Sequence, residues 1–421
     1  MTTRKIMIVA GEASGDAHAA KLVRAFRAVS PESNFDFFGA AGEQLRAVGV
    51  EAIVEADNLS IVGLTEIGRA LPMFLKAFRD LKHAAIERKP DAVILVDFPD
   101  FNLKLAKSLK KQGLTVIYYI SPQLWAWRKY RIRTIRKYVD LVITILPFEK
   151  EWYALHGVAH VEYVGNPLAM EVHAKLSKDD FCQKHDLKHH RPIISLLPGS
   201  RHKEIVRILP VMLEAAAIML DKNPEIQFVI ALASNQDLPD VKKAVASVKN
   251  HNSNKLTIVE NETYDALNAS DAAAVTSGTA TLEAGIIGTP MVIVYKTSNL
   301  NYRLLEPLIS VEHYGLINLI AEKRVAKELI QREFTASTLS EELQHLLEPA
   351  KNAANRAELK AAADKLGHGG ASKRAAEAIF RELKDVFRVR VSKKSLKGTN
   401  VIASGESRRP EIQDGSVPER D

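Results

Sequence analysis

The chain has 421 residues, of which 46% are hydrophobic and 26% charged, a composition typical of an ordinary globular protein with two or three domains. Its formal net charge of +7 suits anionic ligands or an anionic membrane surface, but does not by itself indicate a nucleic-acid-binding protein. The single Cys182 excludes an intrachain disulfide and a cysteine metal cluster, so we expect a cytoplasmic protein. No apolar stretch approaches the ~20 residues of a membrane span, so any membrane contact is expected to be peripheral.

The first apolar run and the loop after it form one candidate site. Ile6–Ala10 predicts a buried strand and is too short for a signal peptide, and helical sequence runs from Ala17 to Val29. The intervening loop lacks the G-x-G-x-x-G spacing, so dinucleotide binding is weakly supported. Its small and polar residues suggest a substrate rim, and they are Glu12, Ser14, Gly15 and Asp16. In the alternative interpretation, Ser14 or Asp16 only caps the helix.

An unusually apolar stretch lies between Leu59 and Leu81. Its large apolar side chains repeat at helical spacing, and Pro72 is expected to start a new helix within it. A core helix explains this pattern, and an interfacial helix that touches a bilayer is the alternative. In the second interpretation the membrane-contacting residues are Leu64, Ile67, Leu71, Phe74, Leu75 and Phe78.

Ala92–Val96 predicts a second buried strand, which carries Asp97 to its carboxyl end. Ligands of open α/β sheets sit beyond the carboxyl ends of the strands, so Asp97 is well placed to act as a base. Asp100, at the start of the next helix, suits a capping role better.

The strand expected over Leu114–Ile120 leads into a turn with two tryptophans, Trp125 and Trp127. Aromatic residues on a turn either line a ligand face or plug a core. The next segment, Arg128–Lys137, has six basic residues in ten. A helix face this basic either meets solvent or attracts phosphates or an anionic leaflet.

Two similar turns follow strands in the second half of the chain. Ile193–Leu197 precedes Gly199, Ser200 and Arg201, with Ser200 as the expected N-cap of a helix from His202 to Leu220. Ala272–Val275 precedes the second turn, which contains Ser277, Gly278 and Thr279, with Glu283 one helical turn further on. Helix N-termini bind anions, and a carboxylate accepts from both ribose hydroxyls. Together the turns predict a site for a nucleotide diphosphate.

The chain contains no D-x-D and no H-E-x-x-H motif, so we expect no metal site and no cofactor. Arg201 and the helix N-termini would then neutralise a leaving diphosphate. Further strands are expected over Leu141–Leu146, Val161–Val164, Gln227–Leu232, Leu256–Val259 and Met291–Tyr295. The alternating strands and helices predict an α/β fold of two doubly wound, Rossmann-like domains that face a cleft. We expect an N-terminal domain over 1–166, a donor-binding domain over 167–350, C-terminal helices over 351–387 and a disordered tail over 388–421.

The motifs together resemble the lipid-A-disaccharide synthase family, GT-B glycosyltransferases of lipopolysaccharide assembly. The resemblance covers roughly residues 4 to 385, and the residues that carry it are Gly11–Asp16, Asp97–Asn102, Ser121–Trp127, Leu146–Glu149, Leu197–Arg201 and Thr276–Glu283. It implies a UDP-2,3-diacylglucosamine donor, a 2,3-diacylglucosamine 1-phosphate acceptor, and transfer with inversion to a β-1,6-linked disaccharide 1-phosphate and UDP. Both substrates are acylated, which implies a cytoplasmic protein peripherally associated with the inner membrane. The resemblance leaves the oligomeric state open, with a homodimer among the alternatives.

The resemblance also implies roles for residues of this chain. Asp97 would be the base and Arg201 would stabilise the departing UDP. The donor site would comprise Gly199, Ser200, Arg201, Ser277, Gly278, Thr279, Glu283 and, by the family's pattern, Asn318. The acceptor side would comprise Glu12, Ser14, Gly15, Asp16, Gln123 and Trp125.

Without the resemblance, the same architecture suits a UDP-sugar 2-epimerase or a non-catalytic nucleotide-binding protein. An epimerase needs no apolar membrane element, so the stretch Leu59–Leu81 argues mildly against it. In a binding module, Asp97 and Glu12 would only cap helices.

Overall fold

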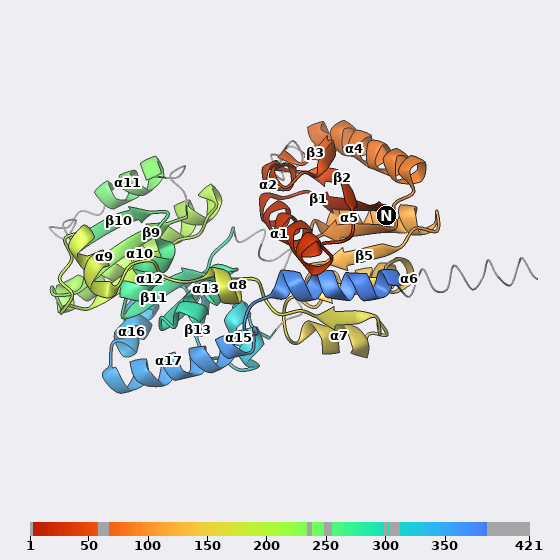
Figure 1. The fold of residues 1–421 in the computed structure, drawn as a ribbon. Helices are drawn as coiled ribbons and strands as arrows, with labels where there is room; N and C mark the ends of the chain where they lie inside the picture. The colour runs from red at the N-terminus through yellow and green to blue at the C-terminus, as the bar shows by residue number, and fades with distance from the viewer. Residues whose placement is uncertain are drawn as a thin grey trace, which may run out of the picture.

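The computed structural model describes residues 3–57, 67–233, 238–247, 255–298, 302 and 312–384. These residues form two α/β lobes that lie side by side (Figure 1). The predicted tail over 388–421 and the candidate membrane residue Leu64 lie outside the described residues, as does the side chain of Ile67.

The N-terminal lobe contains a parallel seven-stranded sheet. Its spatial order is β3 (Glu51–Glu55), β2 (Phe35–Ala41), β1 (Arg4–Ala10), β4 (Ala92–Val96), β5 (Val116–Tyr119), β6 (Leu141–Thr144) and β7 (Val161–Tyr163). The helical segments of this lobe are α1 (Ala13–Val29), α2 (Glu43–Ala47), α4 (Ile67–Arg88), α5 (Pro99–Lys110), η1 (Lys129–Arg131), α6 (Ile132–Tyr138) and α7 (Glu149–Leu155).

The C-terminal lobe contains a parallel six-stranded sheet. Its order is β10 (Leu256–Glu260), β9 (Gln227–Leu232), β8 (Ile193–Leu197), β11 (Ala272–Thr276), β12 (Met291–Tyr295) and β13 (Lys327–Ile330). The helices after the first sheet are α8 (Leu168–Glu171), α9 (Lys178–Lys184), α10 (His202–Lys222), α11 (Leu238–Ser247), α12 (Thr263–Ala269), α13 (Ala280–Ile287), α15 (Leu316–Ala321), α16 (Ala336–Leu346) and α17 (Pro349–Asp364).

Both sheets are buried on both faces, which explains why their central strands are continuously apolar. Successive side chains of β1 point to opposite faces: Ile6 and Ile8 join one buried cluster, and Met7 and Val9 join the other. The predicted pair of doubly wound domains is therefore confirmed.

The end of the chain returns to the first lobe. The last helix, over 371–384, packs its apolar face into the cluster that contains Phe26 of α1 (Figure 1). The Arg374 guanidinium donates to the Val164 carbonyl oxygen over 2.7 Å, and the Asn166 N–H donates to the Leu366 carbonyl oxygen over 2.9 Å. The chain therefore crosses between the lobes twice, and the two crossing segments lie side by side.

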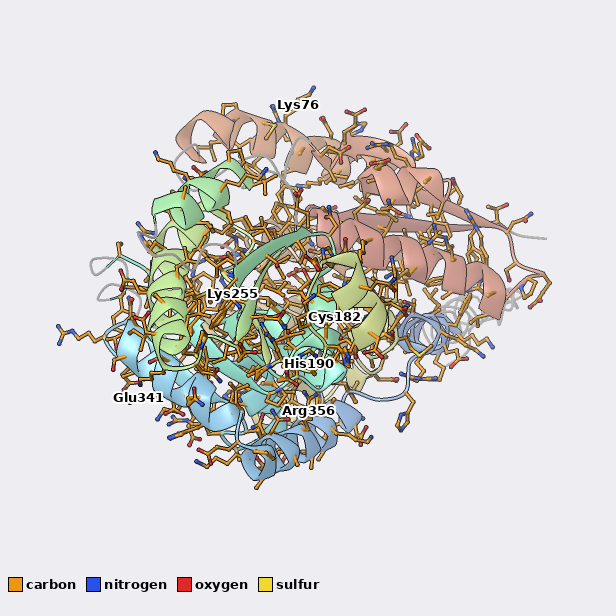
Figure 2. The ribbon with its side chains drawn as sticks, turned by 90° about the vertical axis from the view of Figure 1, so that its left-hand side faces the viewer. Lys76, Cys182, His190, Lys255, Glu341 and Arg356 are labelled. Carbon is orange, nitrogen blue, oxygen red and sulfur yellow. The ribbon has the colours of Figure 1, made fainter. Side chains whose placement is uncertain are left out.

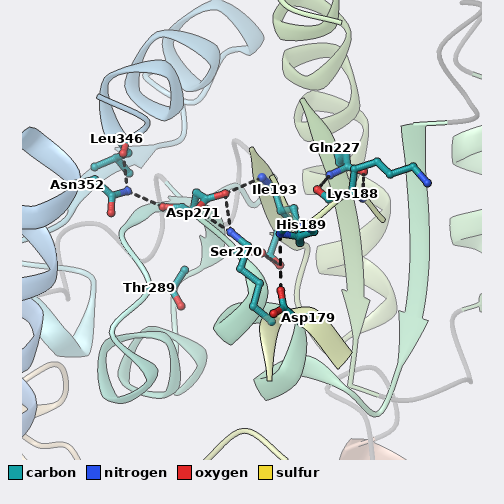
Figure 3. A network of polar contacts seen from close by, with 12 residues as sticks. Asp179, Lys188, His189, Ile193, Gln227, Ser270, Asp271, Thr289, Leu346 and Asn352 are labelled. Atoms are coloured by element: carbon teal, nitrogen blue, oxygen red, sulfur yellow. Dashed lines mark hydrogen bonds and ion pairs between the residues drawn. The ribbon is translucent and has the colours of Figure 1, made fainter. Parts of the chain in front are cut away.

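A polar network fixes the amino ends of β8 and β11 relative to each other (Figure 3). The Asp271 carboxylate accepts from the Ile193 N–H over 2.9 Å, and the Asp271 N–H donates to the Ile193 carbonyl oxygen over 2.8 Å. Asn352 of α17 donates to the Asp271 carbonyl oxygen over 2.7 Å. The network holds the register in which Leu197 and Val275 lie opposite each other at the other end of the strands.

Three features of the secondary structure differ from expectation. Strands β2, β3 and β13 have no counterpart among the predicted strands. Helix α4 runs through Pro72, where a new helix was expected. The proline removes one backbone N–H donor, and the helical turns on either side of it continue. Arg201, not Ser200, is the N-cap residue of α10, and its side chain makes no capping hydrogen bond.

Candidate functional site

In each sheet the strand order reverses once, between β1 and β4 in the first lobe and between β8 and β11 in the second. The loops after such neighbouring strands diverge to opposite faces, so a crevice opens at the carboxyl ends of the strands. Four of the loops that the sequence singles out, after β1, β4, β8 and β11, lie at these two points of reversal, the switch points of the two sheets, and the tryptophan turn follows β5 instead.

In the second lobe, a cavity of about 340 Å³ lies at this point. Seven of the eight predicted donor-site residues line it, and they are Gly199, Ser200, Arg201, Ser277, Gly278, Thr279 and Glu283. A second cavity of about 430 Å³ shares Ala233, Thr263 and Glu283 with it. The combined space therefore extends from the two glycine turns past Glu283.

The two turns depend on glycine. Gly199 has φ +113° and Gly278 has φ +139°, values that L side chains rarely adopt. A Cβ on Gly199 would also lie 2.7 Å from Glu204 Oε2, whereas a Cβ on Gly278 would meet nothing within 4 Å. Each turn leads into a helix, α10 or α13, whose first N–H groups have no intrahelical acceptor and attract anions.

Two charged side chains of the cavity have defined partners. Arg201 Nη1 donates to Glu204 Oε1 over 3.0 Å, and the Arg201 side chain is 81% exposed. The Tyr264 hydroxyl donates to Glu283 Oε1 over 3.1 Å. Burial raises the pKa of Glu283, and the Tyr264 hydrogen bond opposes this. Tyr264 holds one Glu283 oxygen in place, and no sequence spacing pointed to it.

Asn318 is not among the residues that line the cavity, and its predicted nucleotide contact stays a prediction. Its side chain is 0% exposed. Its Nδ2 donates to the Ala326 carbonyl oxygen and to Glu328 Oε1, and its Oδ1 accepts from the N–H groups of Val325 and Ala326. The amide is therefore fully used in holding α15 against the segment before β13.

In the first lobe, Asp97 follows β4 in the left-handed region with φ 46°, and so does Phe98 with φ 52°. Such backbone is strained for residues other than glycine. The Asp97 carbonyl oxygen accepts from the Tyr118 hydroxyl over 2.7 Å and from Asn102 Nδ2 over 2.8 Å. Both donors are buried, so they hold the strained turn and with it the direction of the Asp97 side chain.

The surroundings of Asp97 favour its protonated form. Burial raises the pKa of Asp97 to about 6, with a further contribution from the Glu12 carboxylate, and a hydrogen bond from the Phe98 N–H opposes them. A carboxyl group with a pKa near neutrality both accepts a proton readily and is mostly ionised at pH 7. This is the property that a general base needs.

The loop after β1 is divided between an exposed and a buried part. Glu12 and Ser14 are exposed, and Gly15 lies buried against Val96. Asp16 is buried, and its oxygens accept from the N–H groups of Gly42 over 2.7 Å and Gln44 over 2.8 Å. Asp16 therefore caps α2, and its predicted place among the acceptor-side residues stays a prediction.

The predicted acceptor residues after β5 also separate. Gln123 is exposed, whereas Trp125 is buried in the cluster that contains Ile193 and Ile317 of the second lobe. Trp125 Nε1 donates to Glu149 Oε1 over 3.0 Å. Burial raises the pKa of Glu149 to about 7, against hydrogen bonds from Trp125 and the Leu146 backbone. Trp125 therefore ties the first lobe to the second, and its predicted substrate contact stays a prediction.

The candidate membrane residues of α4 point in two directions. Phe74 and Phe78 are partly buried and contact the Phe101 ring, at centroid distances of 6.4 and 6.0 Å. Leu71 and Leu75 are 54% and 55% exposed.

No helix in the described part of the chain is long and apolar enough to cross a membrane. Among the residues that the structure describes, no group of three or more His, Cys, Asp or Glu side chains is arranged to hold a metal ion.

Comparison with known proteins identifies the family. The profile of the family described as lipid-A-disaccharide synthetase matches residues 6–382. The lipid-A-disaccharide synthase of Syntrophus aciditrophicus is 44% identical over 377 residues, which are 89% of this chain and 97% of that protein. The enzyme of the same name from Myxococcus xanthus is 42% identical and covers 90% of this chain and 97% of its own length.

A solved structure shares the fold at low identity. A crystal structure of a UDP-N-acetylglucosamine 2-epimerase homologue from Listeria monocytogenes has a TM-score of 0.63 at 16% identity, covering 91% of this chain and 98% of its own. At that identity the likeness shows the two-lobe architecture alone. The sequence relatives show more: the chain belongs to the lipid-A-disaccharide synthase family, glycosyltransferases of the GT-B fold that catalyse the glycosyl transfer step of lipid A biosynthesis.

Proposed function

We propose that the chain transfers a diacylglucosamine unit from UDP-2,3-diacylglucosamine to 2,3-diacylglucosamine 1-phosphate, with inversion at the anomeric carbon. The observation that carries this proposal is the pair of switch points. One has a carboxyl group with a pKa of about 6, and the other has a cavity whose two glycine turns suit a diphosphate.

The reaction is a single in-line displacement. Asp97 takes the proton of the acceptor's 6-hydroxyl as its oxygen attacks the anomeric carbon of the donor. The bond from this carbon to the diphosphate oxygen breaks, and UDP leaves with the bonding electrons. Arg201 and the N-termini of α10 and α13 neutralise the charge that develops on the diphosphate.

We assign the ribose of the donor to Glu283. Tyr264 engages Oε1, which leaves Oε2 and the second lone pair of Oε1 to accept from ribose hydroxyls. Glu12, Ser14 and Gly15 lie on the loop beside Asp97, and we assign them, with Gln123, to the acceptor side. Lys21 of α1 pairs with Glu171 of the second cavity over 2.6 Å, so this side of the first lobe lies next to the donor site.

The test is UDP release from UDP-diacylglucosamine with and without the acceptor. Release that requires the acceptor supports the transferase, conversion of the donor without acceptor supports an epimerase, and no reaction supports a binding module.

Asp97→Asn should lower turnover by about 10²- to 10⁴-fold, the usual contribution of a general base. Arg201→Ala should lower turnover far more than it weakens binding of the lipid acceptor. Near-normal turnover of Asp97→Asn would show that another group is the base.

We also propose that α4 places the protein on the cytoplasmic face of the inner membrane. Leu71 and Leu75 are exposed one helical turn apart, and Lys76 extends outward from the same helix (Figure 2). An apolar stripe beside cations is typical of a helix that lies in a membrane interface. Leu71→Ser with Leu75→Ser should reduce sedimentation with anionic lipid vesicles. Leu155→Ser, at a leucine on α7 that is 77% exposed, is the matched control and should not.

A further inference from the structure

A cluster of two arginines and one carboxylate lies at the start of α5, immediately after the strained turn of Asp97. Arg128 Nη1 donates to Asp100 Oδ1 over 3.0 Å, and Arg131 Nη2 donates to the same oxygen. Asp100 is 66% exposed at its side chain, so the cluster opens to solvent. Two guanidinium groups against one carboxylate leave a net charge of +1, and each guanidinium has more N–H donors than the single one that Asp100 engages.

The two arginines are held in position. The Arg131 side chain is only 12% exposed, and the Arg128 guanidinium lies 4.2 Å from the Trp127 ring centroid. Arg128 has φ 54°, and η1 begins directly after it. Guanidinium groups that are already ordered lose little conformational entropy on binding, and their planar fork matches the oxygens of a phosphate.

The cluster lies next to the proposed base. Asp100 follows Asp97 by three residues, so their α-carbons are at most about 11 Å apart. Tyr118, whose hydroxyl donates to the Asp97 carbonyl oxygen, connects them further. Burial raises the pKa of Tyr118, the charges of Asp97 and Asp100 add to this, and the charge of Arg131 opposes it.

We infer that Arg128 and Arg131 bind the phosphate group of the sugar-phosphate acceptor. This inference rests on the proposed function, which it extends by naming the groups that recognise the acceptor. In the pyranose ring of a hexose 1-phosphate, C1 and C5 both bond to the ring oxygen, so the 1-phosphate and the 6-hydroxyl lie on the two sides of that oxygen along one edge of the sugar. With the phosphate on the arginine pair, this edge faces the start of α5 and the 6-hydroxyl reaches Asp97. A phosphomonoester brings more negative charge than Asp100 and competes with it for the two guanidinium groups.

The experiment compares two acceptors, 2,3-diacylglucosamine 1-phosphate and the same lipid without its phosphate. The measured quantity is the ratio of their kcat/KM values. The wild-type ratio should be about 10 to 100, the range for losing charge-assisted hydrogen bonds to one phosphate. Arg131→Gln and Arg128→Gln should bring the ratio close to one. Arg133→Gln, an exposed arginine on the neighbouring α6, is the matched control and should keep the wild-type ratio.

The outcomes separate the inference from the function it rests on. A wild-type enzyme that releases no UDP with the phosphorylated acceptor contradicts the proposed function itself. An active enzyme whose Arg128→Gln and Arg131→Gln variants keep the wild-type ratio overturns the inference alone. If turnover of a variant is too low to measure, equilibrium binding of the two acceptors gives the same ratio.

Phosphate groups of membrane lipids are the other source of this ligand chemistry. Binding to vesicles of phosphatidylglycerol and of phosphatidylcholine distinguishes the two sources. If the glutamine variants lose binding to the anionic vesicles while they keep the wild-type acceptor ratio, the arginines contact the membrane and the inference is wrong. Unchanged vesicle binding together with a collapsed ratio supports it.

Discussion

The environment that suits Asp97 to act as a base should also destabilise the folded protein. The ordinary pKa of an aspartate is 3.8, and that of Asp97 in the folded chain is about 6. The difference of about two pH units, at about 1.4 kcal/mol for each, corresponds to about 3 kcal/mol. Folding therefore favours the protonated form. This contribution is fully present below pH 3.8 and is lost as the pH rises through 6.

Asp97→Asn should consequently be more stable than the wild type at neutral and alkaline pH, because an amide carries no charge to bury. From the two pKa values, its advantage in the free energy of unfolding is about 1.5 kcal/mol at pH 5 and about 3 kcal/mol at pH 8. Urea unfolding measures this, and the fluorescence of Trp125, Trp127 and Trp152 follows the first lobe together with its contact with the second.

Glu151→Gln is the matched control, because Glu151 is an exposed carboxylate on α7 of the same lobe. Its effect on the free energy of unfolding should change little between pH 5 and pH 8. A stability difference between Asp97→Asn and the wild type that stays constant or shrinks over this range would refute the reasoning. In that case the Asp97 carboxylate is as well solvated in the folded protein as in the unfolded chain.

Three further predictions follow from single contacts. Tyr118→Phe removes a buried hydrogen bond to the Asp97 carbonyl oxygen, worth about 0.5–1.5 kcal/mol, so turnover should fall about 2- to 10-fold while UDP affinity, measured by calorimetry, stays unchanged. An equal loss of UDP affinity would contradict this role. Gly199→Ala should weaken UDP binding more than Gly278→Ala, because only the first added Cβ meets Glu204; the reverse order in the same titration would be inconsistent. Glu149→Gln should be less destabilising at pH 8 than at pH 5, because burial raises the pKa of Glu149 to about 7 and the amide has no charge to bury, and a urea midpoint difference from the wild type that is the same at both pH values would argue against it.

The strands that carry the site could be predicted because they are the central ones. Ile193–Leu197 and Ala272–Thr276 are buried on both faces, so they are apolar throughout and end sharply at a polar turn. The edge strands β3 and β13 lack this continuous apolar pattern. In β3 (Glu51–Glu55) both end residues are exposed glutamates, and β13 (Lys327–Ile330) begins with an exposed lysine. Strand β2 contains Gly39, where a Cβ would lie 1.9 Å from the Ile8 carbonyl oxygen, so close packing with β1 explains a residue that is unusual in strands.

The partners of polar side chains were the part of the site that the sequence could not supply. Asn318 and Asp16 have the residue types of ligand-binding groups, yet their oxygens and nitrogens are used by backbone groups of α2 and of the segment before β13. These hydrogen bonds join residues 7 to 28 positions apart, follow from tertiary packing and leave no periodicity in the sequence. Trp125 is a similar case, because the lobe that buries it is distant in the chain.

Both switch points place a functional group on a turn with left-handed backbone, but the second lobe offers N–H donors for an anion and the first lobe offers a carboxylate. In the second lobe, glycine lets the backbone enter conformations that leave helix N–H groups free for an anion, and the strain is small because no side chain is present. In the first lobe, the reacting group must itself be a side chain, so glycine is excluded at Asp97 and the left-handed backbone has to be held by Tyr118 and Asn102. The first lobe therefore carries both the backbone strain and the cost of a buried carboxylate. For this reason we expect substitutions that raise stability at the expense of turnover to concentrate around Asp97 rather than around the donor cavity.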